Sequence, residues 1–267
     1  KHVFLCLAFL LIAACQNSKR PDLGRLYLDH ATDQSNTPLI VIHGTMGSKL
    51  RHKDSKEEMW IGNLKKLAFS NYRDLALEID PQTLKNKPSE LEAFEILDSV
   101  SGMKFYEDLV QILTEFGGYK LSTLDQIAPT GRPLYLFNYD WRQDNVISAQ
   151  QLSDFIDQIL TRHPNHNKVD LVAHSMGGLI ARYYMRYGDK DVLDGDIFTA
   201  KTQTDNIRHA IFLGTPNLGS VLTVNRFING FNVNLRSIPI DVLARMPSVY
   251  QLLPYVPEAW LYDTNGQ

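Results

Sequence analysis

The sequence predicts an α/β fold in which a mostly parallel sheet is covered by helices on both faces. Two observations predict it. Short apolar runs typical of buried parallel strands recur between residues 38 and 213, and the segments between them carry apolar residues at helical spacing. Strands that alternate with helices imply right-handed crossovers and a parallel sheet. A chain of 267 residues is long enough for one large domain with a sizeable core.

The predicted elements follow one another in a regular order. The first strand, 38–42, precedes a long excursion at 48–101 that has no clear periodicity. The segment after the last strand is rich in proline, and residues 218–257 are expected to form a cap or lid. The other predicted strands are 134–139, 169–173 and 209–213, and the predicted helices are 105–116, 152–160 and 177–187.

The strongest chemical signal is the run Ala173-His174-Ser175-Met176-Gly177 between a predicted strand and a predicted helix. This arrangement is typical of the nucleophile elbow of α/β-hydrolases, in which a tight, strained turn holds a serine hydroxyl clear of the backbone. Small flanking residues are needed because the turn brings backbones close together, and Ala173 in place of the usual glycine adds only one methyl group. Ser175 is therefore the predicted nucleophile.

A second glycine-containing run, His43 to Gly47, directly follows the first predicted strand. Acyl transfer develops an oxyanion, which backbone N–H groups can stabilise. In this fold one donor is the residue after the nucleophile, here Met176, and the other comes from this early loop, so Thr45 or Met46 is the candidate. The alternative is a turn without a catalytic role. His43 and His174 are expected to be structural.

The N-terminus resembles a bacterial lipoprotein signal. The apolar run 3–14 is too short to span a bilayer comfortably and ends in Leu11-Ile12-Ala13-Ala14-Cys15, which resembles a lipobox. We expect a signal peptide at 1–14, a lipidated Cys15 with a tether at 15–37, and a catalytic domain at 38–267. The protein would be exported and lipid-anchored to the cell envelope. An ordinary secretory signal that happens to contain a cysteine is the alternative.

Five segments carry a family resemblance: 41–50, Asn138-Tyr139-Asp140-Trp141-Arg142, the elbow, 214–220 and 246–254. Together they resemble the lecithin:cholesterol acyltransferase family of α/β-hydrolases. This resemblance implies an enzyme that cleaves an acyl ester of a lipid at a membrane surface through an acyl-enzyme. It also implies that the excursion, including Trp60, engages the lipid surface; a core position for Trp60 is the alternative. The serine mechanism requires no metal ion, and no cofactor is expected.

The sequence departs from the family pattern in its acid and base. The fold places them after the nucleophile in the order Asp, His, but His209 is the only histidine after Ser175 and precedes the 214–220 motif. The sequence is therefore expected to be C-terminally truncated. A simple lipase or phospholipase without transfer activity, and a lipid-anchored binding protein on a degenerate hydrolase scaffold, are alternatives. The net charge of −3 and the scattered basic residues predict no nucleic-acid partner.

Overall fold

The computed structural model describes residues 35–255, except 63, 84, 101–102, 105, 128–129, 194–201 and 234–235. The predicted signal peptide, Cys15 and most of the tether lie outside the described residues. Within the described ranges, no helix combines the length and the apolar character that crossing a bilayer requires.

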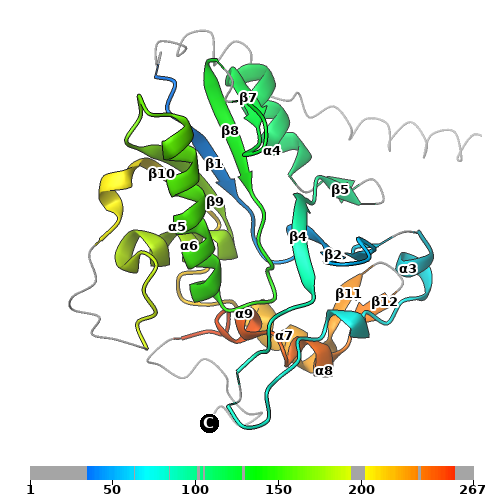
Figure 1. Ribbon diagram of the computed structural model, residues 1–267. Helices are drawn as coiled ribbons and strands as arrows, with labels where there is room; N and C mark the ends of the chain where they lie inside the picture. Colours follow the sequence, from blue (N-terminus) through cyan, green and yellow to red (C-terminus); the bar gives the residue numbers. More distant parts are fainter. Residues whose placement is uncertain are drawn as a thin grey trace, which may run out of the picture.

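A five-stranded parallel sheet forms the centre of the molecule, in the order β10-β9-β1-β8-β7 (Figure 1). Its strands are β1 (Leu39–Ile42), β7 (Tyr119–Ser122), β8 (Arg132–Phe137), β9 (Val169–His174) and β10 (Ile207–Leu213). The predicted strands are all present, and the predicted α/β class is confirmed.

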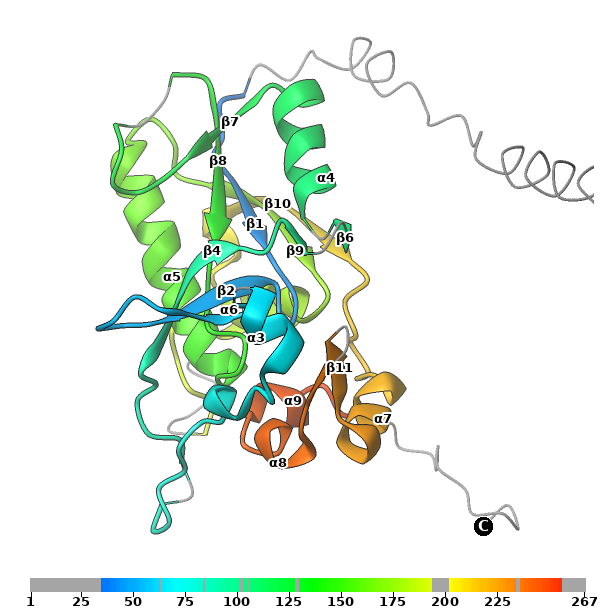
Figure 2. The ribbon, with the colours of Figure 1, turned by 90° about the vertical axis from the view of Figure 1, so that its right-hand side faces the viewer.

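Helices cover both faces of this sheet, with α5 on one side and α4 on the other (Figure 2). They are α4 (Glu107–Gln111), which continues as the π-helical turn η2 (Ile112–Phe116), α5 (Asn145–Arg162) and α6 (Met176–Tyr187). The four residues of β1 are buried, because successive side chains of a strand point to opposite faces. Ile40 and Ile42 join the core with α5 and α6, whereas Leu39 and Val41 join a second core with residues of α4.

The excursion between β1 and α4 folds as short elements beside the carboxyl ends of the central strands. A three-stranded antiparallel sheet has the order β3-β2-β4. The elements are β2 (Ser48–His52), β3 (Glu58–Trp60), α3 (Leu64–Phe69), the 3-10 turn η1 (Arg73–Leu75), β4 (Leu91–Ile96), β5 (Ser99–Val100) and β6 (Met103–Lys104).

The predicted cap follows β10 and lies beyond the carboxyl ends of the strands (Figures 1 and 2). It consists of α7 (Val221–Asn229), the hairpin β11 (Phe231–Val233) and β12 (Arg236–Ile238), α8 (Ile240–Leu243) and α9 (Pro247–Tyr250). Polar contacts join it to the excursion: Arg73 forms a 2.5 Å ion pair with Asp241, and the Asn86 amide donates to the Arg245 carbonyl at 3.1 Å.

Candidate active site

Ser175 occupies the apex of the turn between β9 and α6. Its backbone has φ 52° and ψ −125°, a conformation that L-residues rarely adopt outside strained functional turns. The Ser175 amide donates to the Leu213 carbonyl of β10 at 2.8 Å, which ties the turn to the sheet. In the described part of the chain, Ser175 Oγ forms no hydrogen bond with another protein group, and Ser175 lines a pocket.

Two glycines after the nucleophile allow α6 to begin close against the sheet. A Cβ on Gly177 would lie 2.3 Å from the His43 carbonyl oxygen and 2.7 Å from that of Ile42. A Cβ on Gly178 would lie 1.9 Å from Thr215 Oγ1. Glycine is required at these positions because other backbone or side-chain atoms already fill the space.

The loop after β1 lies directly against the nucleophile. A Cβ on Gly44 would come within 2.7 Å of Ser175 Cβ, and Thr45 and Met46 line the same pocket as Ser175. The pocket has a volume of about 260 Å³. The structure therefore brings Ser175 together with the loop that carries the two candidate oxyanion donors.

Most carbonyls of this loop, residues 43–48, already accept hydrogen bonds. Three of the donors are aromatic side chains that approach from different parts of the sequence, and their bonds fix the direction of the peptide groups. The bonds are Tyr139 Oη to His43 O (2.7 Å), Gly47 N to Gly44 O (3.1 Å), Trp60 Nε1 to Met46 O (3.2 Å), Leu97 N to Gly47 O (2.8 Å) and Trp141 Nε1 to Ser48 O (3.1 Å).

Two consecutive amides of the loop remain free. Among the described residues, neither the Thr45 nor the Met46 N–H donates to a protein acceptor, whereas the Gly44 N–H donates to Tyr106 Oη at 2.7 Å. Met46 has φ 63°, and a left-handed residue next to another free amide is typical of anion-binding backbone nests. Met176 begins α6, so its N–H has no intrahelical acceptor. The amides of Thr45, Met46 and Met176 therefore have no described acceptor, and all three lie in the segments that meet at Ser175.

Trp60 is not exposed, and the prediction that it contacts lipid is wrong for this structure. Its side chain is 2% exposed, and its ring packs edge-to-face against Trp141 at 5.4 Å and Tyr72 at 5.5 Å. A buried indole needs an acceptor for its N–H, and Trp60 finds it in the Met46 carbonyl. Trp60 therefore supports the loop beside Ser175 from within the core.

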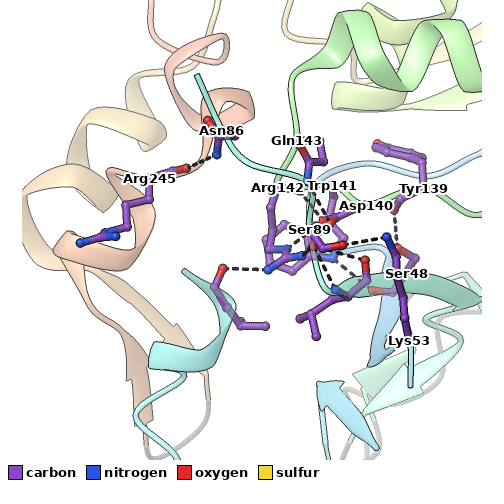
Figure 3. Close-up of polar contacts among 12 residues, drawn as sticks. Ser48, Lys53, Asn86, Ser89, Tyr139, Asp140, Trp141, Arg142, Gln143 and Arg245 are labelled. Atoms are coloured by element: carbon purple, nitrogen blue, oxygen red, sulfur yellow. Dashed lines mark hydrogen bonds and ion pairs between the residues drawn. The ribbon is translucent and has the colours of Figure 1, made fainter. Parts of the chain in front are cut away.

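The Tyr139-Asp140-Trp141-Arg142 segment connects the excursion to the sheet (Figure 3). Arg142, with a side chain 1% exposed, forms a bidentate ion pair with Asp140 at 2.6 and 2.8 Å. Its remaining donors reach the Leu75 carbonyl at 3.0 Å and Ser89 Oγ at 2.7 Å, so its charge is paired and its N–H groups are largely satisfied. In the same network Ser48 Oγ donates to the Tyr139 carbonyl at 2.7 Å.

Two histidines lie near Ser175, and neither contacts its hydroxyl. His43 is fully buried and stacked on Tyr139 at 4.1 Å, and its Nδ1–H donates to the Gly44 carbonyl. Burial lowers the pKa of His43 to about 3. His174 Nδ1 lies 2.7 Å from Tyr106 Oη; because that oxygen accepts the Gly44 N–H, its hydroxyl hydrogen is available for His174. Desolvation lowers the pKa of His174 and raises that of Tyr106 to about 12.

No general base for Ser175 is present among the described residues. No described imidazole or carboxylate hydrogen-bonds to Ser175 Oγ. The Asp241 carboxylate of the cap is paired with Arg73. His209 Nδ1 lies 3.3 Å from a carboxylate oxygen of Asp170 on β9. Asp263 lies outside the described residues.

Several contacts around the site were not predicted from the sequence. Tyr106 and Tyr139 hold the loop 43–48 through their hydroxyl groups. Tyr139 belongs to the 138–142 segment, but that segment did not predict this contact, and no sequence signal marked Tyr106. The rest of the pocket comes from the cap and from the loop after β10, and it is mainly apolar. These lining residues are Gly214, Pro216, Ser220, Leu222, Thr223, Arg226, Phe231, Leu243, Val249 and Leu252.

Comparisons with known proteins agree with this fold. The crystal structure of the Tle4–Tli4 complex contains a chain that superposes with a TM-score of 0.56 at 17% identity, covering 86% of this chain and 59% of that one. The mature Bacillus licheniformis lipase BlEst2 gives a TM-score of 0.37 at 14% identity, with 81% and 56% covered, which is too low to support a shared fold by itself.

The sequence comparisons identify the family. The "Uncharacterized protein YJR098C" of Saccharomyces cerevisiae is 24% identical over 157 residues, which cover 59% of this chain but only 22% of the yeast protein. A family model described as lecithin:cholesterol acyltransferase matches residues 53–264 and confirms the resemblance seen in the sequence motifs. The chain belongs to the lecithin:cholesterol acyltransferase family.

Proposed function

We propose that this protein is a serine-dependent acyl-ester hydrolase or O-acyltransferase that acts on lipids through an acyl-enzyme. One observation carries the proposal: Ser175, at the apex of a strained turn, shares a largely apolar pocket with two loop residues whose amides are free, Thr45 and Met46. An apolar pocket suits an acyl chain, and free amides suit the oxyanion that forms during acyl transfer. Membership of the family supports the same chemistry.

In the proposed reaction, Ser175 Oγ attacks the ester carbonyl carbon and its proton passes to a base. The carbonyl oxygen becomes an oxyanion that accepts hydrogen bonds from the amides of Met176 and of Thr45 or Met46. The ester bond then breaks, the alcohol leaves with a proton, and the acyl group remains on Ser175. Water or a second alcohol completes the cycle, which gives hydrolysis or transfer. We propose that the base and its acid partner come from outside the described residues.

The cap supports action at a lipid surface. Ser220, which precedes α7, and Leu222, Thr223 and Arg226 of α7 line the pocket. Phe227 of the same helix packs against the core, whereas Val221 is 65% exposed and Ile228 66% exposed. Leu218 and Leu222, 65% and 59% exposed, extend the same apolar surface at the pocket. A lipid surface would cover these side chains while the pocket receives an acyl chain.

The proposed mechanism predicts esterase activity that depends on Ser175. The full-length protein should hydrolyse p-nitrophenyl esters of medium-chain acids, and the Ser175→Ala variant should retain less than about one thousandth of that rate. The Ser55→Ala variant, which changes an exposed serine of the excursion, should hydrolyse them at the native rate. A well-folded native protein without activity toward esters or phospholipids would favour the binding-protein alternative.

Anchoring through Cys15 is a separate proposal that the lipobox-like sequence supports. Bacteria that express the full-length gene in the presence of radiolabelled palmitate should incorporate the label into the protein. The Cys15→Ala variant should remain unlabelled. Labelling that persists in this variant would contradict lipidation at Cys15.

A further inference from the structure

The Tyr106 hydroxyl joins the two segments that meet at the nucleophile. Its oxygen lies 2.7 Å from the Gly44 amide nitrogen of the loop after β1 and 2.7 Å from His174 Nδ1 at the end of β9. Gly44 directly precedes the two candidate oxyanion donors of the loop, and His174 directly precedes Ser175. One side chain from the segment before α4 therefore ties the loop 43–48 to the elbow.

The direction of these two hydrogen bonds fixes the state of His174. The Gly44 amide can only donate, so the Tyr106 oxygen accepts, and the phenolic hydrogen is left for His174 Nδ1. No other described group accepts that hydrogen. Nδ1 must then carry a lone pair, which makes His174 a neutral imidazole with its hydrogen on Nε2. The bridge thus requires an uncharged acceptor at position 174.

The surroundings keep the bridge in this state at neutral pH. Tyr106 is 6% exposed, and burial raises its pKa to about 12, so the hydroxyl keeps its hydrogen. Desolvation lowers the pKa of His174 below its ordinary value of 6.5, and no described carboxylate forms an ion pair with its ring. The neighbouring rings of His43 and Tyr139 are uncharged too, because burial lowers the pKa of His43 to about 3 and raises that of Tyr139 well above its usual range.

We propose that Tyr106, with neutral His174 as its acceptor, is a positioning residue for catalysis at Ser175. By holding the Gly44 amide, the hydroxyl fixes the start of the turn whose next two amides stay free for the oxyanion. Donors that are already held in place stabilise a developing charge without reorganisation. The bridge should therefore affect the chemical step more than substrate binding. The inference rests on the proposed function, because it assigns a positioning group to the same site.

Protonation of His174 is incompatible with this bridge. Nδ1 would become a second donor to the Tyr106 oxygen, and the phenolic hydrogen would lose its acceptor in a buried place. One of the two bonds must then weaken, and the hold on the Gly44 amide weakens with it. The enzyme therefore loses kcat when His174 gains a proton, in addition to any loss from protonation of the catalytic base.

The first test removes the hydroxyl from the full-length enzyme. In Tyr106→Phe, esterase kcat at about pH 8 should fall about tenfold while KM stays within about twofold of the native value. The matched control is Tyr135→Phe: this buried tyrosine also has its hydroxyl beside a histidine, 2.9 Å from His163 Nε2, but makes no hydrogen bond to the loop. Its kcat should stay native. Native kcat in Tyr106→Phe, or a change in KM alone, would overturn the proposal.

The second test changes the acceptor. His174→Asn offers an amide oxygen near the position of Nδ1, whereas His174→Leu offers no acceptor, so kcat at about pH 8 should be about tenfold higher in the asparagine variant. As the pH falls from about 8 to about 5, native kcat should fall relative to that of His174→Asn, because residue 174 gains a proton only in the native enzyme. Equal kcat in the two variants, or a constant ratio across this range, would contradict the bridge.

Two measurements without turnover separate this inference from the proposed function. NMR of the labelled imidazole should place the His174 hydrogen on Nε2, and amide hydrogen exchange at Gly44 should be faster in Tyr106→Phe but not in Tyr135→Phe. A hydrogen on Nδ1, or unchanged exchange at Gly44, would overturn the inference even in an active enzyme. A native protein that shows the expected tautomer and exchange but cleaves no ester would contradict the proposed function instead.

Discussion

The two sides of the pocket differ in how their polar groups are satisfied. On the side of the loop 43–48, most backbone carbonyls accept hydrogen bonds from protein groups. The amides of Thr45 and Met46 have no acceptor among the described residues. On the side of α7, neither the Thr223 hydroxyl nor the Arg226 guanidinium hydrogen-bonds to another described residue, although the guanidinium lies over the Phe231 ring. Val221, Leu222 and Ile228 of this helix are exposed.

This difference separates two tasks. Donors that are held in place before the reaction stabilise charge that develops only in the transition state, because they need no reorganisation. Pocket side chains that lack a protein hydrogen-bond partner can instead bind the substrate in its ground state, and they therefore influence which substrate is chosen. We therefore expect changes near the loop 43–48 to lower kcat, and changes in α7 to affect mainly binding and KM.

The largest effect is expected from Gly177→Ala, because its Cβ would lie 2.3 Å from a backbone oxygen of the loop. The elbow would have to move away from the loop, and a displacement of about 1 Å can reduce a rate about a hundredfold. Esterase kcat/KM should therefore fall at least about a hundredfold. The control is Gly118→Ala, where no atom lies within 4 Å of the added Cβ, although φ there is 68° and an alanine is itself strained. A Gly177→Ala enzyme within tenfold of native activity would contradict the packing described.

The next effect concerns stability and pH at His43. Its folded-state pKa is about 3 and its ordinary value 6.5, so between these values the unfolded chain binds a proton that the folded chain does not. Stability is therefore lost as the pH falls below about 6.5, by about 2 kcal/mol at pH 5 from this group. Denaturant unfolding at pH 7.5 and 5 should show this loss, and His43→Asn should lack it. Equal pH dependence in both proteins would contradict a buried neutral imidazole.

A smaller effect is expected from Trp60→Phe, which keeps an aromatic ring but removes the donor to the Met46 carbonyl. The loop should become less ordered, and kcat should fall about tenfold while KM stays within twofold. Tyr184→Phe, which removes a hydroxyl of the buried core away from the loop, should leave kcat unchanged. A change in KM alone would show that Trp60 does not act through the oxyanion site.

The smallest effect is expected on the outer face of α7. In a Cys15→Ser background that lacks the proposed anchor, Val221→Asp should weaken partition onto phosphatidylcholine vesicles several-fold. Hydrolysis of a soluble short-chain ester should change less than twofold. The matched control is Ile127→Asp, an exposed isoleucine on the loop between β7 and β8. Equal partition of the two variants would argue against α7 as the lipid-facing element.

Local sequence patterns predicted the parts of the fold that depend on neighbouring residues. The run 38–42, the elbow at Ser175 and the helix after it combine continuous hydrophobicity, small residues and a 3.6-residue period. Each is present in the structure, and the predicted fold class and family are confirmed.

The supporting contacts could not be predicted because they join residues far apart in the sequence. Tyr106 and Tyr139 reach the loop 43–48 from 62 and 96 residues away. The prediction for Trp60 was wrong because a tryptophan in an irregular polar segment gives no sign of whether a distant acceptor, here Met46, will bury it. The sequence also gives no sign that the Thr223 hydroxyl lacks a hydrogen bond to the other described residues.

The most direct test of Ser175 as the nucleophile is to map the adduct of a fluorophosphonate probe on the native full-length protein by peptide mass spectrometry. We expect one adduct, on Ser175, formed at a rate that Trp60→Phe reduces and Arg245→Gln does not. Labelling of a different serine, or a folded native protein that does not react, would contradict Ser175 as an activated nucleophile.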